Sequence, residues 1–270
     1  MKVWGLHLAV LAALALLGLV LPQYHATNLA RIMVLAVFAM GYNLAFGYAG
    51  LLSLGHALFF AAGMYGAGLP AWHWGWGAAP ALLAGAMAGG LVAVIVGLLA
   101  LRTAAARRRQ LTRRRRDRRV DGGATLAADG PRYALAWGLF TVALGLSLLL
   151  VRSRFGRVMV ALRENEERAR MLGINPYAAK LQVMGISGLY SGAAGAAYAL
   201  LFGYVGGTFA DIQYSILPML YVLLGGAGTV LGAGLGAALM FYLTDVASSV
   251  TDAWLFVVGA ALVVLVLFAP

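Results

Sequence analysis

The chain consists largely of long apolar runs separated by short polar stretches. A helix needs about 20 mainly apolar residues to cross a bilayer, and most of these runs approach that length. None shows the alternation of apolar and polar positions that marks a membrane strand. The pattern predicts membrane helices in the segments Trp4–Leu21, Ala30–Tyr48, Leu51–Leu69, Ala79–Leu101, Tyr133–Val151, Leu181–Tyr204, Ile216–Leu224, Val230–Leu243 and Ala253–Ala269.

Two of these segments, Ile216–Leu224 and Val230–Leu243, are too short to cross a membrane alone. The glycine-rich run Gly225–Gly228 joins them, which predicts two half-helices or a tight membrane hairpin. Interrupted helices occur at membrane depth only where protein or a cavity covers the exposed backbone. We therefore expect this region beside a translocation path or in a tightly packed core.

Glycines recur every four residues in two places, Gly188 with Gly192, and Gly228 with Gly232 and Gly236. Small residues at this spacing let helix backbones approach closely in lipid. Close helix packing is the expected role, and helix sliding during gating is the alternative.

Composition agrees with a membrane protein, because 63% of the residues are hydrophobic, 11% are charged and the mean hydropathy is +0.87. A soluble domain carries about 25% charged residues. The predicted fold is an all-α, polytopic integral membrane helix bundle with broken or re-entrant helices, forming one domain over residues 1–270. Cysteine is absent, which excludes disulfides and thiolate metal sites. The first segment could be a signal peptide, but its length favours a retained span.

The net charge of +11 has a local origin. Half of the Lys and Arg residues lie in the tract Arg102–Arg119. Basic residues favour the cytoplasmic side, and the stretch Arg152–Arg170 is also basic, yet only Tyr133–Val151 separates the two. A single span would place them on opposite sides. Three explanations stay open: Tyr133–Val151 does not cross simply, Leu51–Leu69 is re-entrant so that the tract faces out, or a span is missing.

The chain lacks the parts of a self-powered transporter. Its only lysines, Lys2 and Lys180, follow no GxxxxGK[ST] loop, so it does not hydrolyse ATP by that route. An ion-coupled carrier usually needs an ionisable group within the membrane, and His56 is the only candidate we identify. We predict no catalytic residue, no cofactor and no metal site. An energised transporter of this kind would need an external motor.

A compact, highly charged stretch of mixed sign is Arg163–Gly173, which reads RENEERARMLG. From Gly156 onwards the chain can form one short amphipathic helix with its Glu and Arg side chains in water, and Gly173 is suited to end it. We interpret the stretch as a docking element for a soluble partner. A solvated loop is the alternative, since charge runs are usually solvated surfaces. The apolar positions of the predicted helix are Val160, Met171 and Leu172.

Several stretches together resemble the branched-chain amino acid ABC transporter permeases, over about residues 30–101 and 133–270. Two short stretches and ALRENE between them are similar to that family's cytoplasmic coupling loop, two resemble its early signature, and two resemble its later spans. Leu51 departs from the pattern, which would have a polar Gln there. In that order the stretches are Gly156–Arg157, Ala161–Glu166, Leu172–Ile174, Tyr42–Gly50, Leu52–Ala57, Gly192–Ala199 and Gly225–Gly228.

The resemblance implies a bacterial inner-membrane permease that acts as one of two homologous pore subunits. Two cytoplasmic ATP-binding subunits and a periplasmic amino-acid-binding protein would complete the importer. Closure of the ATPases would pull on the coupling loop, residues 152–177, and switch the pore from outward- to inward-facing. The residues matched to ATPase docking are Arg163, Glu164, Asn165, Glu166 and Gly173.

Three polar residues inside apolar segments, Asn43, Ser53 and His56, are candidates for the translocation path. Polar groups in a membrane either find partners or line a cavity. Hydrogen bonding between helices is the alternative role for all three.

Residues 102–132 depart from the family, which would have a further apolar helix here. A coding-frame disruption or a degenerate segment is our hypothesis, with an anionic-lipid patch as an independent reading. An RNA-binding arm lacks interleaved aromatics, so the expected partners include membrane lipid and no nucleic acid. A self-sufficient channel or facilitator and a non-functional permease stay open as alternatives to an amino-acid importer.

Overall fold

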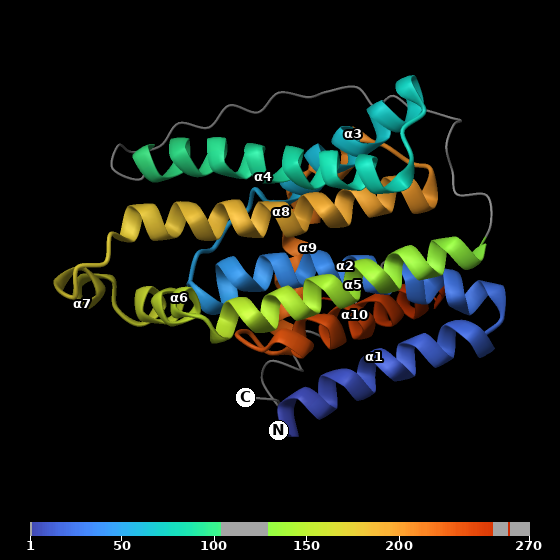
Figure 1. Cartoon of the computed structure of the whole chain (residues 1–270), viewed down its shortest axis with the longest axis horizontal. Helices are drawn as coiled ribbons and strands as arrows, with labels where there is room; N and C mark the ends of the chain where they lie inside the picture. The colour runs from blue at the N-terminus through green and yellow to red at the C-terminus, as the bar shows by residue number, and fades with distance from the viewer. Residues whose placement is uncertain (1, 104–128, 251–258, 260–270) are drawn as a thin grey trace.

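The structure is a computed structural model that describes residues 2–103, 129–250 and 259. Every element formed by these residues is helical, which confirms the all-α prediction. Most of the long helices lie side by side in one bundle (Figure 1). In chain order the elements are α1 (Lys2–Val20), α2 (Gln23–Asn43), the π-helix η1 (Leu44–Tyr48), α3 (His56–Trp74), α4 (Ala78–Thr103), α5 (Asp129–Arg152), α6 (Arg154–Glu164), α7 (Glu166–Met171), α8 (Pro176–Phe202), the 3-10 helix η2 (Gly207–Ala210), α9 (Ile212–Gly225) and α10 (Val230–Val250).

Five helical segments are long and apolar enough to cross a membrane, which confirms the polytopic organisation. Two shorter apolar helices accompany them, within α1 and as α9. The predicted span Ala253–Ala269 lies outside the described residues, apart from position 259. The five segments are Gln23–Tyr48, Ala78–Leu101, Pro131–Arg152, Pro176–Phe202 and Val230–Ser249.

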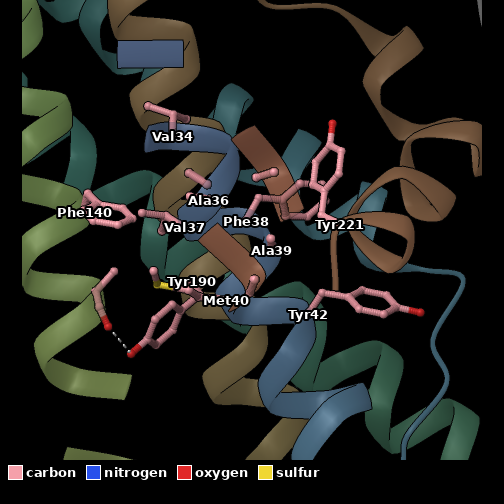
Figure 2. Close-up of a cluster of buried hydrophobic side chains, with 14 of the residues drawn as sticks. Val34, Ala36, Val37, Phe38, Ala39, Met40, Tyr42, Phe140, Tyr190 and Tyr221 are labelled. Atoms are coloured by element: carbon pink, nitrogen blue, oxygen red, sulfur yellow. Dashed lines mark hydrogen bonds between the residues drawn. The ribbon is translucent and has the colours of Figure 1, made fainter. Parts of the chain in front are cut away.

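Helix α2 lies at the centre of the bundle and contacts α5, α8, α9 and α10. Its side chains from Val34 to Tyr42 are buried with few exceptions. Figure 2 shows them surrounded by Phe140 of α5, Tyr190 of α8 and Tyr221 of α9. Because lipid is as apolar as these side chains, close packing rather than the hydrophobic effect favours this arrangement. The central helix therefore connects the other elements of the site described below.

Glycines let the backbones of α3, α4 and α8 touch one another. A methyl group added to Gly63 would overlap the backbone of Gly192. One added to Gly192 would lie 2.8 Å from Cα of Gly89. Gly188 likewise faces the backbone of Gly89. The predicted close packing at Gly188 and Gly192 is confirmed, and these three helices form a compact block.

The predicted hairpin is also confirmed, because α10 packs against α9 through glycines. A methyl group on Gly236 would lie 2.8 Å from the backbone nitrogen of Gly225. Gly232 faces the carbonyl of the same Gly225. Gly228 plays a different part, since it takes a left-handed φ of 86° in the turn.

The prediction of two half-helices is wrong for the second one. Helix α10 continues to Val250 instead of ending at Leu243, and it is long enough to span. Its polar end is helical although Ser and Thr are not strong helix formers, and there their hydroxyl groups bond back to carbonyls of the preceding turn. Thr244 donates to Met240 O at 2.9 Å, and Ser248 donates to Asp245 O at 3.0 Å.

A break separates α2 from α3. The π-helix η1 forms the last turn of the membrane segment that begins with α2. The irregular residues 49–55 follow it, and α3 begins at His56. The predicted helix Leu51–Leu69 is therefore shifted to His56–Trp74. The broken helices were expected at Ile216–Leu224 and Val230–Leu243, so this break lies at a place that the hydropathy pattern did not predict.

Packing contacts fix the direction of each helix. Gly97 near the end of α4 faces Leu181 at the start of α8, whereas Gly85 near its start faces Ala196, so α4 and α8 are antiparallel. Helix α5 leads into α6 and starts beside Phe202, the last residue of α8. Helices α4 and α5 therefore run in the same direction (Figure 1). We call the end that carries α6 and α7 the loop end, and the opposite one the far end.

This arrangement bears on the charge conflict in the sequence. Helix α4 ends at the loop end with Thr103, and α5 begins at the far end with Asp129. Helix α5 passes from one end to the other, and Arg102 lies at the same end as the charged stretch. Of the three explanations, the described helices agree with a missing span.

Candidate coupling and translocation site

Three parts of the chain meet at the loop end: the end of α2 with η1, the end of α6, and the turn between α9 and α10. Gly47 lies at the meeting point. A methyl group there would collide with the Asn43 side chain and lie 2.6 Å from the Gly228 nitrogen. Only a residue without a side chain permits this approach.

Asn43 holds the α9–α10 turn. Its side chain is 2% exposed, its Nδ2 donates to Thr229 O at 2.8 Å, and its Oδ1 accepts from the Gly228 nitrogen at 2.9 Å. The amide thus binds a donor and an acceptor of the same turn. These bonds are the interhelical kind that we named as the alternative for Asn43. Its place on a translocation path stays a prediction.

Arg163 connects α6 to the same point. Its Nη1 donates to Gly47 O, within the π-helix, and its side chain packs over Gly50. A π-helix disturbs the regular backbone bonding of an α-helix and is frequent at functional sites. A guanidinium donor makes a stronger bond to a carbonyl than a neutral group does. The charged loop is therefore bonded directly to the irregular end of α2.

The predicted single helix from Gly156 to Leu172 is two helices in the structure. Asn165 is extended, with φ −160° and ψ 110°, and interrupts it. Its Oδ1 accepts from the Arg168 nitrogen at 3.0 Å and so caps α7. Gly173, at φ 81°, follows the end of α7, as predicted for a terminator.

Glu166 faces its own protein. Its carboxylate accepts from Lys180 of α8, and Arg170 lies 3.1 Å from it. The hydrogen bond from Lys180 is the main cause that lowers the pKa of Glu166 below its ordinary value. Glu166 therefore fastens α7 to α8.

Other side chains of α6 and α7 point into open space. Glu164 and Glu167 are exposed. Met171 is 84% exposed and Leu172 is 78% exposed, although both are large and apolar. The buried face is formed instead by Met159, Leu162 and Ala169. Among the predicted docking residues, Arg163, Asn165 and Glu166 each bond to other groups of the chain, although Arg163 and Asn165 are exposed as Glu164 is.

His56 is fully buried where α2, α3 and α8 meet. Its Nε2 lies 2.6 Å from Ser187 Oγ, which donates to Gly41 O at 2.6 Å. The serine proton is therefore used, so His56 donates from Nε2. Its Nδ1 is buried without a hydrogen-bond partner among the described residues.

Ser53 lies in the irregular segment before α3, where its hydroxyl accepts from the Gly55 nitrogen at 3.3 Å. Two serines that we did not predict bind the helices instead. Ser187 accepts from His56, and Ser215 of α9 accepts from the Ala57 nitrogen at 3.0 Å. Both are polar residues in apolar segments, the signal that identified His56, and a consistent use of it would have found them.

Arg31 is a further residue that the sequence interpretation passed over. It lies in α2, towards the far end, and lines a cavity of about 210 Å³. Its Nε is buried without a hydrogen-bond partner within the described part of the chain. The signal was present, since Arg31 is a charged residue inside a predicted span.

Comparison with known proteins identifies one family whose model matches most of the chain. A family model described as branched-chain amino acid transport system / permease component matches residues 25–109 and 119–267. The gap in the match falls within the arginine-rich tract. No solved structure matches the chain.

Similar proteins are permeases of import systems. The high-affinity branched-chain amino acid transport system permease protein LivM of Escherichia coli is 26% identical, over 88% of this chain and 67% of the relative. The autoinducer 2 import system permease protein LsrC of Photorhabdus luminescens is 28% identical, over 50% of this chain and 43% of the relative. LsrC of Salmonella typhi is 32% identical, over 43% of this chain and 34% of the relative.

The family model covers most of the chain, and the helices form a polytopic membrane bundle. Members of such a family transport a solute and do not catalyse a reaction on it. The chain therefore belongs to the branched-chain amino acid transport permease family, as a multi-pass ABC-type permease.

Proposed function

We propose that this chain is one of two homologous permease subunits of a bacterial inner-membrane importer for branched-chain or related amino acids. Two cytoplasmic ATP-binding subunits supply the energy, and a periplasmic amino-acid-binding protein delivers the solute. Similarity to LivM over 88% of the chain supports this substrate class. Similarity to LsrC, a permease of an autoinducer 2 import system, supports the role in import without narrowing the solute.

The bond from Arg163 to Gly47 carries the mechanistic proposal. A soluble ATPase that pulls on α6 and α7 moves Arg163, and Arg163 moves the π-helical end of α2. Asn43 then passes the displacement to the α9–α10 turn through its two hydrogen bonds. Two irregular elements are thus shifted by one external motion, and irregular backbone at membrane depth is found where protein covers it or where it lines a cavity.

The outward side chains of the loop form the docking surface in this mechanism. Exposed Met171 and Leu172 supply an apolar contact, and Glu164 and Glu167 supply charges beside it. Anchoring apolar side chains within a polar rim are typical of protein interfaces. Arg163, Asn165, Glu166 and Gly173 hold this surface in position.

Co-purification of ATPase activity with the tagged chain tests the docking surface. We expect the double variant Glu164→Ala with Leu172→Ala to lose the associated ATPase and ATP-dependent uptake. Tyr24→Ala is the control, because Tyr24 is 66% exposed at the start of α2, at the far end. Solute flux through the purified chain alone in liposomes, with no ATPase present, would establish the channel alternative and overturn the proposal.

A second candidate, a non-functional permease, is favoured by one observation. The family match is interrupted at residues 110–118, between Thr103 at the loop end and Asp129 at the far end. Reading the other frames of the coding DNA tests this candidate: an apolar helix encoded in one of them supports it, and its absence from all of them removes the frame-disruption hypothesis.

A further inference from the structure

The far end of the bundle contains a cavity whose walls come from several helices. It is lined by residues of α2, α3, α8, η2, α9 and α10. Helix α8 starts at the loop end, so Tyr198 near its end marks the far end. Phe241 and Thr244, near the end of α10, lie there too. The cavity is thus separated from the loop end by most of the length of α2.

Arg31 is the only charged side chain among the described residues that line this cavity. Its Cζ lies 4.7 Å from the ring centroid of Phe202, so one part of the guanidinium is held by a cation–π contact. Its Nε is buried without a hydrogen-bond partner among the described residues. A cation inside a membrane helix is costly and usually faces a partner or a solute pathway.

Aromatic rings form much of the remaining wall. Phe209 lies between Tyr198 and Tyr214, with ring centroids 5.3 Å and 4.6 Å away, and Tyr221 lies on the same wall. Such a wall accepts an apolar side chain, and the tyrosine hydroxyls add polar contacts. The volume of about 210 Å³ lies below the 300–1,000 Å³ that holds drug-sized ligands, which suits a small solute.

We propose that this cavity is a solute-binding site within the permease, in which Arg31 binds a carboxylate and the aromatic wall binds an apolar side chain. The guanidinium presents its donors in a fork that matches a carboxylate. This inference rests on the proposed function for its ligand class, a free amino acid, and for the outward position of the far end. It adds a site in the membrane subunit to the recognition that the binding protein provides.

Binding of radiolabelled L-leucine to the purified complex tests the site. Arg31→Gln keeps a polar side chain but removes the charge, and we expect it to weaken leucine binding by about 30-fold or more, as for one partner of a buried charge pair. L-leucinamide, which lacks the carboxylate, should bind weakly to the wild type and be insensitive to the change. The exposed Arg154 of α6 gives the control Arg154→Gln, with unchanged binding. Equal leucine affinity in Arg31→Gln and wild type would overturn the inference.

A second measurement does not depend on altering Arg31. The natural chain has no cysteine, so Thr244→Cys places one thiol in the cavity wall. We expect L-leucine to slow its modification by a water-soluble thiol reagent, and L-leucinamide to have no effect. Ser248→Cys, one turn further along α10 and exposed, is the control that leucine should leave unprotected. Modification of Thr244→Cys at the same rate with and without leucine contradicts the site.

These outcomes are separable from those of the proposed function. A complex that retains its ATPase and its uptake but shows no leucine protection at Thr244→Cys loses the cavity site and keeps the importer. A chain that binds leucine through Arg31 but recruits no ATPase keeps the cavity site and loses the importer.

Discussion

Single glycines decide how closely the helices of this bundle approach. Gly192 of α8 lies against the backbone of α4, whereas Gly138 of α5 has open space around its Cα. The two positions have the same residue and opposite tolerance for a side chain. They therefore provide a matched pair in which only the surroundings of the new methyl group differ.

We expect Gly192→Ala to destabilise the bundle by about 1–3 kcal/mol, the range for overpacking a filled core. The obstacle at Gly192 is backbone, which cannot move aside as a side chain can. Gly138→Ala should be neutral or stabilise by up to about 1 kcal/mol, because alanine favours a helix more than glycine does. Unfolding of the purified protein in detergent checks both, and equal stability of the two variants would show that the helices do not touch at Gly192.

Arg163 is the residue at which coupling can be separated from assembly. Arg163→Gln removes the charged bond to Gly47, and we expect ATPase activity to remain associated while ATP-dependent uptake falls at least tenfold, which corresponds to about 1.4 kcal/mol. Arg154→Gln, at an exposed arginine of the same helix outside the stretches that resemble the coupling loop, is the control and should transport normally. Loss of the associated ATPase in Arg163→Gln would instead place Arg163 in the docking surface.

Sequence reasoning at this scale found the polar residues but not their partners. Asn43 and His56 were visible because they interrupt apolar segments. Their partners, Gly228, Thr229 and Ser187, lie more than a hundred residues away, and no local pattern pairs them. Arg31 was overlooked because it stands near the edge of a predicted span, where charges are ordinary.

At the scale of elements, one ion pair connects the charged loop to a membrane helix. Lys180 near the start of α8 holds Glu166 of α7, and the pKa of Glu166 lies below its ordinary 4.5 as a result. At pH values above the ordinary pKa, a carboxyl group with a lowered pKa stabilises the folded state. This contribution is lost as the pH falls through the lowered pKa. Glu166 is 37% exposed, so solvent screening limits the pair to at most about 1 kcal/mol.

We expect Glu166→Gln to raise amide hydrogen exchange in α7 and the following turn at pH 7. The difference from wild type should shrink at pH values below 4.5, where the wild-type carboxylate becomes protonated. Glu167→Gln, an exposed neighbour in the same helix, should match wild type at each pH. A Glu166→Gln difference that is independent of pH would contradict the ion-pair explanation.

Element boundaries were predicted well where apolar composition decides them and poorly where side-chain bonds do. Helix α4 follows its apolar run closely, from Ala78 to Thr103. Helix α10 extends past its run through Thr244 and Ser248, which interrupt the apolar pattern and whose hydroxyl groups bond back to helix carbonyls. The break at Asn165 depends on its cap of Arg168, which helix periodicity does not reveal.

At the scale of the whole molecule, the directions of α4 and α5 can be tested without reference to residues 104–128. Pro131→Cys at the start of α5 should be labelled from the same side of the membrane as Trp74→Cys at the end of α3. Leu172→Cys in the charged loop should be labelled from the other side. All three residues are exposed, and the chain has no competing cysteine. Labelling of Pro131→Cys and Leu172→Cys from one side would mean that α5 does not cross.

The charge conflict showed in the sequence that the topology was incomplete, and the departure from the family at residues 102–132 indicated where. The structure adds that α4 and α5 run in the same direction, so Thr103 and Asp129 lie at opposite ends of the bundle. Long-range packing was needed because the count of spans alone leaves the direction of α5 open.

The glycine contacts among α3, α4 and α8 provide a reference frame for following the transport cycle. Because the backbones touch at Gly63, Gly89 and Gly192, sliding of these helices past one another would drive backbone atoms into each other. Spin labels at Leu91 of α4 and Leu189 of α8, both exposed, should therefore report one constant separation whatever nucleotide is bound. The distance between labels on Leu91 and on Leu235 of α10 would then measure the displacement of the α9–α10 hairpin relative to helices that do not move against one another.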